Sequence, residues 1–512
     1  MLILHGLTIK SFHEGLISKQ FSTFEIIKEF FDYIEEHDKK IGAYLSLHKD
    51  KALLQANNID RGIAGGEEFG NLAGVPLAIK DNILIEGFRA TAASKILKHY
   101  SAAYDATVIK KLKNSNAIFL GKTNMDEFAC GSSTENSGFQ ITKNPHDLGR
   151  VPGGSSGGSA ASIAGNMAIG ALGSDTGGSI REPASFCGVV GLKPTYGTVS
   201  RYGLMAMASS LDQIGPLTKT VEDAAILFNA IKGKDEFDAT SVDYAYSDDL
   251  LNPKLEKIKT LKIGVPREYF VGGLAHEVQS ALDEARKSLE SLGIEFKEIS
   301  LPHSKYALSA YYIIMPAEVS SNFSRFDGVR YSRGDMTTGR ASTGSVNNSA
   351  LTNIYFKTRG EGFGAEVRRR IMLGTYVLSS GYYDAYYAKA QKIRRLIKED
   401  FDRAFEEVDV IFSPVAPTTA FKIGEKTKDP LQMYLSDIFT IPVNLAGLPA
   451  ISIPVHSTLN NNGMSSPVTP HTSHSTPHTS LPIGFQLIGK YFGEADILGI
   501  GTFYERIHAN LV

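Results

Sequence analysis

Two runs of small residues constrain the fold of this chain more than any other feature. Residues 153–159 read GGSSGGS, and residues 173–181 read GSDTGGSIR. Glycine at this density costs backbone entropy, so a fold accepts it where N–H groups must approach another group closely or where the chain turns without room for Cβ. Because each run also presents serines, the pair predicts a nucleophile with a backbone oxyanion hole.

Composition narrows the class of protein. The 512 residues are 42% hydrophobic and 21% charged, with a formal net charge of −2. This is an ordinary globular balance without a basic excess, so any RNA contact should be local or made by a partner. The N-terminus has no secretory or transit pattern, and no apolar run reaches about 18 residues, so we expect a cytoplasmic chain without membrane contact.

The two cysteines, Cys130 and Cys187, exclude a disulfide framework. We interpret both as small, semi-buried residues in a reducing compartment. Cys130 lies beside a Gly-Ser stretch, which leaves open a second interpretation, in which it lines a site.

Alternating strands and helices predict an α/β fold. Apolar runs at 74–82, 117–121 and 167–172 are typical of buried strands, and helical patterns cover 105–114 and 159–166. The same alternation returns after residue 260, with strands at 261–265 and 294–299 and helices at 278–292 and within 365–407. The succession of strand, glycine-rich loop and helix is typical of a layered α/β fold.

Other segments stand outside this alternation. Ser22 begins a capping-box pattern, and the apolar spacing predicts an amphipathic helix over 22–37, packed on its own body or on a partner. Residues 335–353 and 457–480 are rich in small polar residues and are predicted to be inserted loops. A cluster of tyrosines is interpreted as core and subunit-facing bulk rather than platforms for stacking bases: Tyr382, Tyr383, Tyr386 and Tyr387.

A serine hydroxyl is a poor nucleophile at neutral pH unless a base lies within hydrogen-bond reach. Residues 153–157 match G-x-S-x-G, but Pro152 before them denies a strand hydrogen bond, so the context of a nucleophile elbow is missing. Histidines are sparse, since only His99 and His146 fall between residues 49 and 275. These observations disfavour a Ser-His-Asp site.

Lys80 is the better candidate base. It ends an otherwise apolar strand, where burial would lower its pKa and leave an uncharged amine; the alternative is a solvated lysine or one paired with Asp81. Residues 121–123 (GKT) match the end of the phosphate-binding loop motif, but Asn116 occupies the position where that motif requires a glycine, so we do not predict a phosphate-binding loop. No metal-ligand spacing stands out, and we do not interpret the histidines of 457–480 as a physiological metal site.

Longer motifs carry a family resemblance: AIKDN at 78–82, GKTNMDEF at 121–128, PGGSSGGSAA at 152–161 and GSDTGGSIREPA at 173–184. Through them the chain resembles the amidase signature family. The resemblance implies an α/β fold in which helices cover both sides of a large mixed central β-sheet. It also implies a single domain over residues 1–512, with a signature core at about 74–225 and an N-terminal helical segment at about 8–60.

The resemblance implies roles for named residues. Ser179 would be the nucleophile, Ser155 the bridging serine whose preceding peptide bond is cis, and Lys80 the base. Backbone N–H groups would form the oxyanion hole, from Thr176, Gly177, Gly178 and Ser179. Asp175 and Arg181 flank this loop, and we expect them to brace it as an ion pair rather than to react.

Recognition of an amino-acid substrate needs a cation and an anion, because the substrate carries an α-carboxylate and an α-ammonium. By the resemblance, Arg370 would hold the carboxylate, Asp437 the ammonium, and Tyr311 would support the amino-acid moiety. The register is open by one residue, because Arg370 ends a run of arginines at 368–370 and Tyr311 is followed by Tyr312. For Asp437, a surface carboxylate is the alternative.

Within the family, the resemblance extends to glutaminase subunits of tRNA-dependent amidotransferases, through segments 191–197, 209–217 and 379–387. It implies hydrolysis of glutamine to glutamate and ammonia. Two partners, the B and C subunits, would complete a heterotrimer, in which the B partner uses ATP and magnesium to amidate Glu-tRNA(Gln) and, in some organisms, Asp-tRNA(Asn). Contact with the mischarged tRNA would be mainly through that partner, and this chain itself would need no cofactor or metal. A stand-alone amidase and a non-catalytic scaffold are the alternatives.

Overall fold

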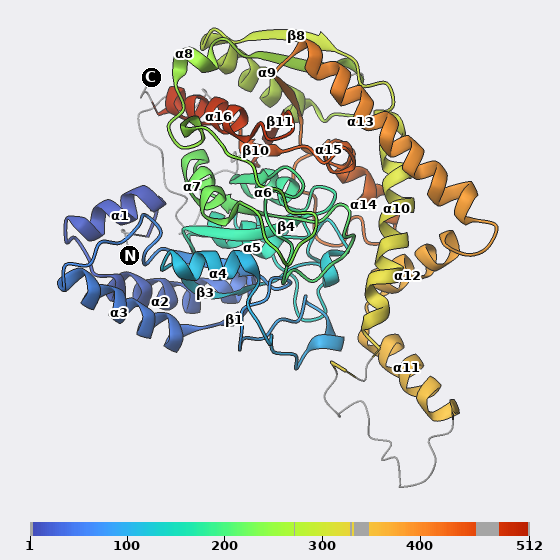
Figure 1. Cartoon of the computed structure of the whole chain (residues 1–512), viewed down its shortest axis with the longest axis horizontal. Coiled ribbons are helices and arrows are strands. Elements are labelled where there is room, and N and C mark those ends of the chain that lie inside the picture. The colour runs from blue at the N-terminus through green and yellow to red at the C-terminus, as the bar shows by residue number, and fades with distance from the viewer. Residues whose placement is uncertain (1–3, 271, 328–329, 332–347, 457–480, 510–512) are drawn as a thin grey trace.

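A mixed β-sheet runs through the protein (Figure 1). In the part of the chain that the structure describes it has 11 strands, in the order β1-β3-β2-β4-β6-β5-β10-β11-β9-β7-β8. The structure is a computed structural model, and it describes residues 4–270, 272–327, 330–331, 348–456 and 481–509. The strands are β1 Tyr44–Leu47, β2 Pro76–Lys80, β3 Ile118–Thr123, β4 Gly170–Asp175, β5 Val190–Lys193, β6 Gln213–Thr218, β7 Lys262–Pro266, β8 Glu295–Ile299, β9 Val410–Pro414, β10 Ala450–Pro454 and β11 Gly484–Gly489.

Parallel and antiparallel pairs both occur in this sheet. β2 is parallel to β3 and β4, and β7 is parallel to β8 and β9. Between these two parallel groups, β4, β6, β5, β10, β11 and β9 pair antiparallel in succession. The prediction of a large mixed central sheet is therefore confirmed.

Helices cover both faces of the sheet. A Cβ added at Gly170 of β4 would meet Leu227 of α7, whereas one added at Gly173, on the opposite face, would meet Ser156 and Ile180, which precede α5 and α6. The helices are α1 Ile9–Ile17, α2 Thr23–Ile41, α3 Lys49–Ala64, α4 Thr107–Asn114, α5 Gly157–Ala164, α6 Arg181–Cys187, α7 Val221–Ile231, α8 Leu255–Ile258, α9 His276–Ser291, α10 Ala307–Asn322, α11 Asn348–Gly362, α12 Ala365–Val377, α13 Lys389–Glu407, α14 Pro430–Tyr434, α15 Ile441–Ala446 and α16 Glu494–His508.

One strand of the predicted core is displaced along the sequence. The apolar run at 167–172 predicted a strand, but β4 spans Gly170–Asp175 and extends into the second glycine-rich run. β4 pairs with β6 along its whole length, from Gly170 opposite Thr218 to Asp175 opposite Gln213. These hydrogen bonds hold Gly-Ser-Asp as a strand, although the residue types themselves have weak strand propensity.

The N-terminal segment that was predicted to be helical also contains β1, which pairs with β3. α2 begins after a capping box at Ser22 and ends at Ile41, before the left-handed Gly42, so it is longer than the predicted helix. Its apolar face is buried in the protein's own core, at Ile26, Ile27, Phe30, Phe31 and Ile34. The interpretation that this helix packs on its own body is therefore confirmed.

The two predicted inserted loops fall largely on residues outside the described ranges, at 335–347 and 457–480. Residues 348–353, which were also predicted to be loop, instead begin α11. Their small polar composition indicated a loop, but Asn and Ser are also frequent where helices start. The single-domain organisation over residues 1–512 stays a prediction.

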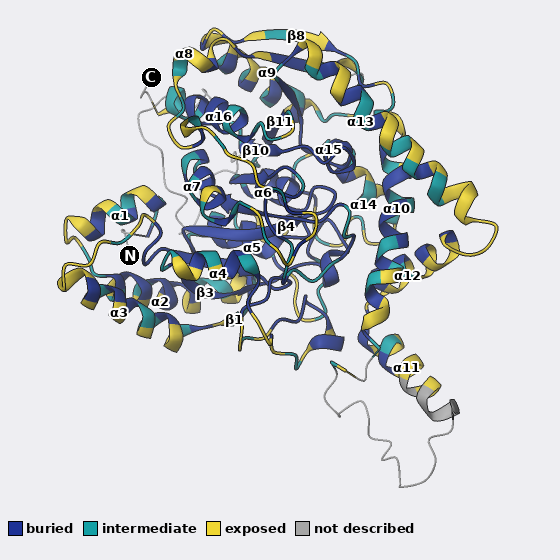
Figure 2. Ribbon diagram, viewed as in Figure 1, coloured by how far each residue is buried: buried dark blue, intermediate teal, exposed yellow. Residues whose placement is uncertain are grey.

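The clustered tyrosines do not belong to the core, so that part of their interpretation is wrong. Tyr382, Tyr383 and Tyr386 are 38%, 46% and 43% exposed, on a segment that projects from the protein between α12 and α13 (Figure 2). The rings contact one another rather than the sheet, with the centroids of Tyr376 and Tyr382 4.3 Å apart. Aromatic residues predict burial only where a second layer covers them.

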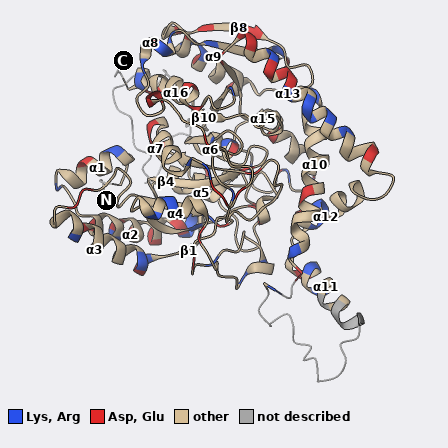
Figure 3. Cartoon of the chain, viewed as in Figure 1, with Lys and Arg blue, Asp and Glu red and all other residues tan. Residues whose placement is uncertain are grey.

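Charged residues of both signs are interspersed along the outer helices (Figure 3). Within the described ranges, no helix combines the length and the apolar character needed to cross a membrane.

α10 and α12 approach each other closely, and together they carry two predicted site residues. Tyr311 lies on α10 and Arg370 on α12. Between the helices, Gly374 faces the backbone carbonyl of Pro316, and a Cβ at this glycine would overlap that carbonyl. The absence of a side chain at Gly374 therefore sets the distance between the two helices.

We expect Gly374→Ala to lower the free energy of unfolding by about 1–3 kcal/mol, because the added methyl overpacks a backbone contact. Gly360→Ala on α11 is the matched control, since no atom lies within 4 Å of its Cβ position and alanine favours a helix. Urea denaturation of both variants checks this. Equal stability of the two variants would contradict the close contact.

Candidate active site

Lys80 is the last residue of β2, and its side chain is completely buried. Its Nζ lies 2.7 Å from Ser155 Oγ, 2.8 Å from Ser156 Oγ and 2.9 Å from Ser174 Oγ. The carbonyl of Ser174 lies 3.2 Å away. The central strands β2 and β4 are parallel, and β2 ends at Lys80. Their pairing thus brings the amine next to both glycine-rich runs.

Burial lowers the pKa of the Lys80 amine to about 7, against the opposing influence of Asp126, Asp175 and Asp212. A substantial fraction of the amine is therefore uncharged near neutral pH and able to accept a proton. The alternatives of a solvated lysine and of an ion pair with Asp81 are wrong. Asp81 pairs instead with the buried Lys122, at 3.6 Å.

The two serines of the predicted triad lie on neighbouring loops. The peptide bond between Gly154 and Ser155 is cis, as the resemblance implied. The loops are joined by a hydrogen bond from the Ser156 N–H to the Ser179 carbonyl, at 3.1 Å. Ser155 is completely buried, whereas Ser179 is 8% exposed, so Ser179 is the serine that a substrate can reach.

The predicted oxyanion loop, residues 176–179, follows β4 directly. The Gly178 N–H donates to Asp175 Oδ1 at 2.9 Å, so the protein itself engages this donor. In this respect the structure differs from the prediction for Gly178, because Asp175 folds back under the loop. Within the described residues, no acceptor is recorded for the N–H groups of Thr176, Gly177 and Ser179.

Asp175 and Arg181 form a buried bidentate ion pair, so the predicted brace is confirmed. Arg181 Nε and Nη2 donate to the two carboxylate oxygens, at 3.1 and 3.0 Å. Burial alone would raise the pKa of Asp175, but the charge and hydrogen bonds of Arg181 lower it to about 2. The carboxylate therefore stays ionised. Its two oxygens accept hydrogen bonds from the N–H groups of Gly178 and Ile180, which hold the loop in place.

Tyr311 and Asp437 face the oxyanion loop from the side of α10 and α14. Tyr311 Oη lies 2.7 Å from the position that a Cβ of Gly177 would occupy, and Asp437 Oδ1 lies 3.2 Å from that of Gly178. Asp437 is 6% exposed and accepts a hydrogen bond from Ser132 Oγ at 2.5 Å, so the surface-carboxylate alternative is wrong. Burial raises its pKa to about 7.

Arg370 is buried, whereas Arg368 and Arg369 are exposed, so Arg370 is the arginine of the run that points into the protein. Its Nε donates to Glu366 Oε1 at 2.8 Å. Among the described residues, the hydrogen-bond acceptor nearest its Nη1 is the thioether of Met315, at 3.6 Å, which is a weak acceptor. Part of the guanidinium thus remains available for a stronger acceptor.

Comparison with known proteins identifies the family of this chain. The family described as "Amidase" matches residues 25–498. This chain belongs to the amidase family. It is 55% identical to the A subunit of the glutamyl-tRNA(Gln) amidotransferase of Carboxydothermus hydrogenoformans over 98% of this chain and 97% of that relative. It is 53% identical to the protein of the same name from Heliobacterium modesticaldum, again over 98% and 97%. The crystal structure of the protein of this name from Thermotoga maritima superposes with a TM-score of 0.75, at 42% identity, over 98% and 95% of the two chains.

Sequence reasoning missed three polar side chains of this amidase that contact the Lys80 amine or one of its hydrogen-bond partners. They are Ser156, Ser174 and Asn82, whose Nδ2 donates to Ser174 Oγ at 3.0 Å. The motifs contain all three residues, but only pairing of β2 with β4 brings the second run to Lys80.

Other candidates take no part in this arrangement. His146 Nε2 contacts the carbonyl of Cys187 at 2.9 Å rather than a serine. Cys130 is buried, and burial raises the pKa of its thiol to about 12, so it is not a reactive thiolate. Among the described residues, no group of three or more His, Cys, Asp or Glu is placed to hold a metal ion.

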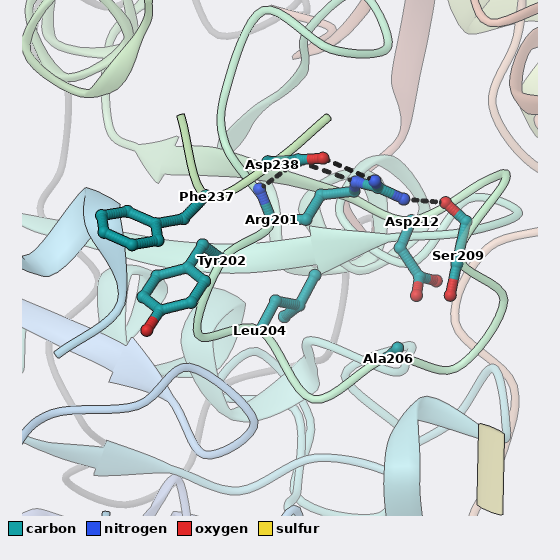
Figure 4. Close-up of a pocket in the computed structure, with 8 residues that line it drawn as sticks. All are labelled: Arg201, Tyr202, Leu204, Ala206, Ser209, Asp212, Phe237 and Asp238. Carbon is teal, nitrogen blue, oxygen red and sulfur yellow. Dashed lines mark hydrogen bonds and ion pairs between the residues drawn. The ribbon is translucent and has the colours of Figure 1, made fainter. Parts of the chain in front are cut away.

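A cavity of about 180 Å³ lies close to the oxyanion loop in the fold, because one of the residues that line it is Asp212 (Figure 4). It is lined in part by Arg201, Asp238 and Asp212, and Arg201 pairs with Asp238 at 2.7 Å. Asp212 accepts a hydrogen bond from Thr176 Oγ1 at 2.7 Å, which connects the cavity wall to the loop. The amidase loop is thus supported from two sides, by Asp212 and by Asp175.

We expect Asp175→Asn to lower the free energy of unfolding by about 3–5 kcal/mol, because Arg181 would remain as an uncompensated buried charge. The folded-state pKa of about 2 lies below the unfolded value of about 3.9, so the wild type should lose this advantage only as the pH falls from about 4 towards 2.

Asp147→Asn is the matched control, because Asp147 is 48% exposed and its pair with Arg150 should contribute much less. Urea denaturation between pH 3 and pH 8 measures both variants. A loss no larger for Asp175→Asn than for the control would show that the brace contributes nothing.

Proposed function

We propose that this amidase is the glutaminase subunit of a tRNA-dependent amidotransferase. The observation that carries the proposal is the buried amine of Lys80, 2.7 Å from Ser155 Oγ and with a pKa lowered by burial to about 7. Relatives that match almost the whole chain at more than 50% identity are named as the A subunit of a glutamyl-tRNA(Gln) amidotransferase, which supports the assignment of glutamine as the substrate.

In the proposed reaction, the Ser179 hydroxyl attacks the side-chain amide carbon of glutamine. Its proton passes to Ser155, while the Ser155 proton passes to the uncharged amine of Lys80. The carbonyl oxygen becomes an oxyanion and accepts hydrogen bonds from the free N–H groups of the loop, those of Thr176, Gly177 and Ser179. The charge develops only in the transition state, so these donors lower the barrier rather than merely bind the substrate.

Collapse of the tetrahedral intermediate returns the proton through Ser155 to the amide nitrogen. The carbon–nitrogen bond breaks, ammonia leaves, and a glutamyl ester remains on Ser179. Water then attacks the ester by the same relay, which releases glutamate and restores the Ser179 hydroxyl. Every proton that Lys80 accepts is given back, so the site needs no cofactor.

The charged groups on the Tyr311 side fit the ends of glutamine. The remaining donors of Arg370 would bind the α-carboxylate, which is a stronger acceptor than the thioether of Met315. Asp437 would bind the α-ammonium, and a positive charge beside it favours the ionised carboxylate, although burial raises its pKa to about 7. Tyr311 would separate the two charged ends above Gly177.

The relatives are named as one of several subunits, which implies an assembly with other chains. We propose two partners, the B and C subunits of the heterotrimer, with ATP, magnesium and the mischarged tRNA handled by the B partner, and a cytoplasmic location. Glu-tRNA(Gln) is the tRNA that the names of the relatives indicate, and Asp-tRNA(Asn) is a second candidate. A stand-alone amidase is the alternative function, but an uncharged amide would not need both Arg370 and Asp437. The scaffold alternative leaves the ordered contacts of Lys80 without a purpose.

Ser179→Ala should lower glutamine hydrolysis by about 10⁴-fold or more, because it removes the oxygen that attacks the amide in the proposed reaction. Amidation of Glu-tRNA(Gln) with added ammonia, measured with the variant in complex with its partners, should stay near the wild-type rate. Loss of both reactions in a complex that still assembles would contradict the proposed division of labour.

Arg370→Lys should raise KM for glutamine about 10–100-fold, because lysine cannot replace a charge-assisted fork with a carboxylate. Arg369→Lys is the matched control on the same helix, since Arg369 is exposed. Initial rates of ammonia release from glutamine measure both. Similar KM values for the two variants would favour a substrate without an α-carboxylate.

A further inference from the structure

The hydrogens around Lys80 must be arranged in one particular way for the proposed relay to run. An uncharged amine has two N–H groups and one lone pair. To accept the Ser155 proton, the lone pair must face Ser155 Oγ, 2.7 Å away. Both N–H groups must then find acceptors among the other neighbours, which are Ser156 and Ser174.

Ser156 meets this requirement. Its hydroxyl donates to the carbonyl of Ser174 at 3.1 Å, so its own proton is already placed. Its oxygen lies 2.8 Å from Lys80 Nζ and is left as an acceptor. One N–H of the amine is therefore fixed on Ser156.

The second N–H can be accepted by Ser174, at its carbonyl 3.2 Å away or at its hydroxyl oxygen 2.9 Å away. The direction of the Ser174 hydroxyl proton then decides whether the lone pair of Lys80 is free for Ser155. Ser174 Oγ has two neighbours among the described residues, Lys80 Nζ at 2.9 Å and Asn82 Nδ2 at 3.0 Å. With Asn82 donating, the acceptor within reach of the Ser174 proton is the lone pair of Lys80, for which Ser174 then competes with Ser155. Asn82 Oδ1 is buried without a hydrogen-bond partner.

A half-turn of the Asn82 amide exchanges its oxygen and nitrogen. The oxygen then accepts the Ser174 proton, and Ser174 Oγ accepts the second N–H of Lys80. The lone pair of the amine is left facing Ser155. The two orientations each leave one amide group unpaired, so the amide can take either, but only this one takes the Ser174 proton away from the lone pair that Ser155 needs.

We propose that Asn82 is a positioning residue, which acts through the hydroxyl of Ser174 to direct the lone pair of Lys80 at Ser155. The inference rests on the proposed function only for the role of Lys80 as base. It does not depend on the identity of the substrate.

The test measures serine reactivity separately from glutamine hydrolysis. A fluorophosphonate reacts with Ser179 as the oxygen attacks phosphorus, fluoride leaves and the hydroxyl proton passes into the relay. The rate of adduct formation is followed by intact mass from pH 5 to pH 9 on the full chain, with Ser179→Ala as the blank. Glutamine hydrolysis by the complex is measured in parallel.

Asn82→Ala should lower both kcat and the rate of phosphonylation about 10–100-fold, with KM for glutamine changed less than about twofold. Asn82→Asp keeps the shape and can only accept from Ser174, so the plateau rate at high pH should recover. Its negative charge joins those of Asp126, Asp175 and Asp212 and raises the pKa of Lys80, so the acid limb should lie at higher pH than in the wild type.

A double-mutant cycle with Ser174→Ala decides whether Asn82 acts through that hydroxyl. In the Ser174→Ala background, Asn82→Ala should have little further effect. Full additivity, a wild-type rate for Asn82→Ala, or an unshifted acid limb for Asn82→Asp would each overturn the inference. If the wild type reacts with the fluorophosphonate but does not hydrolyse glutamine, the proposed function fails and the positioning role is still tested.

Discussion

The burial of one amine at the end of β2 is the constraint on which the rest of the site depends. Water would keep Lys80 protonated, and a protonated amine cannot act as a base. The central strands remove that water, and three hydroxyls and a carbonyl replace it. Hydroxyl groups solvate the amine without the full charge that would return its pKa to the ordinary value, and the nearest carboxylates offset only part of the effect of burial.

Such a site also explains why so many small residues lie together. A Cβ at Gly158 would overlap the backbone of Asn124, so the first run must lie directly against its neighbours to bring Ser155 to the amine. The second run is held by a different interaction, the buried pair of Asp175 and Arg181. The Asp175 carboxylate of that pair also accepts a hydrogen bond from the Gly178 N–H, which makes the loop more rigid. The N–H groups of the neighbouring loop residues are left for the substrate. Glycine density therefore reflects close packing as much as oxyanion binding.

The sequence was sufficient to predict those features of the fold that depend on a local pattern of residues. Apolar periodicity was sufficient to predict α2 and most strands, and the long motifs pointed to Lys80, Ser155 and Ser179, whose catalytic roles stay predictions. What it missed depends on contacts that residue type and periodicity do not reveal, whether between distant segments or within one loop. β4 extends to Asp175 because β6 pairs with it, and the Gly178 N–H is occupied because a side chain folds back. The tyrosines after α12 were misplaced because residue type alone does not reveal whether another layer covers them.

In the proposed mechanism, the two tasks of the site fall to different parts of the fold. The sheet and the two runs hold the groups that would move protons, whereas Tyr311 and Arg370, the proposed substrate-binding residues, lie on α10 and α12, outside the sheet. Charges that recognise an amino acid would shift the pKa of Lys80 if they stood beside it, because charges interact strongly in a buried site. The charges that act most on the Lys80 amine are instead those of Asp126, Asp175 and Asp212. On this argument, substrate preference can change through the helices without altering the proton relay.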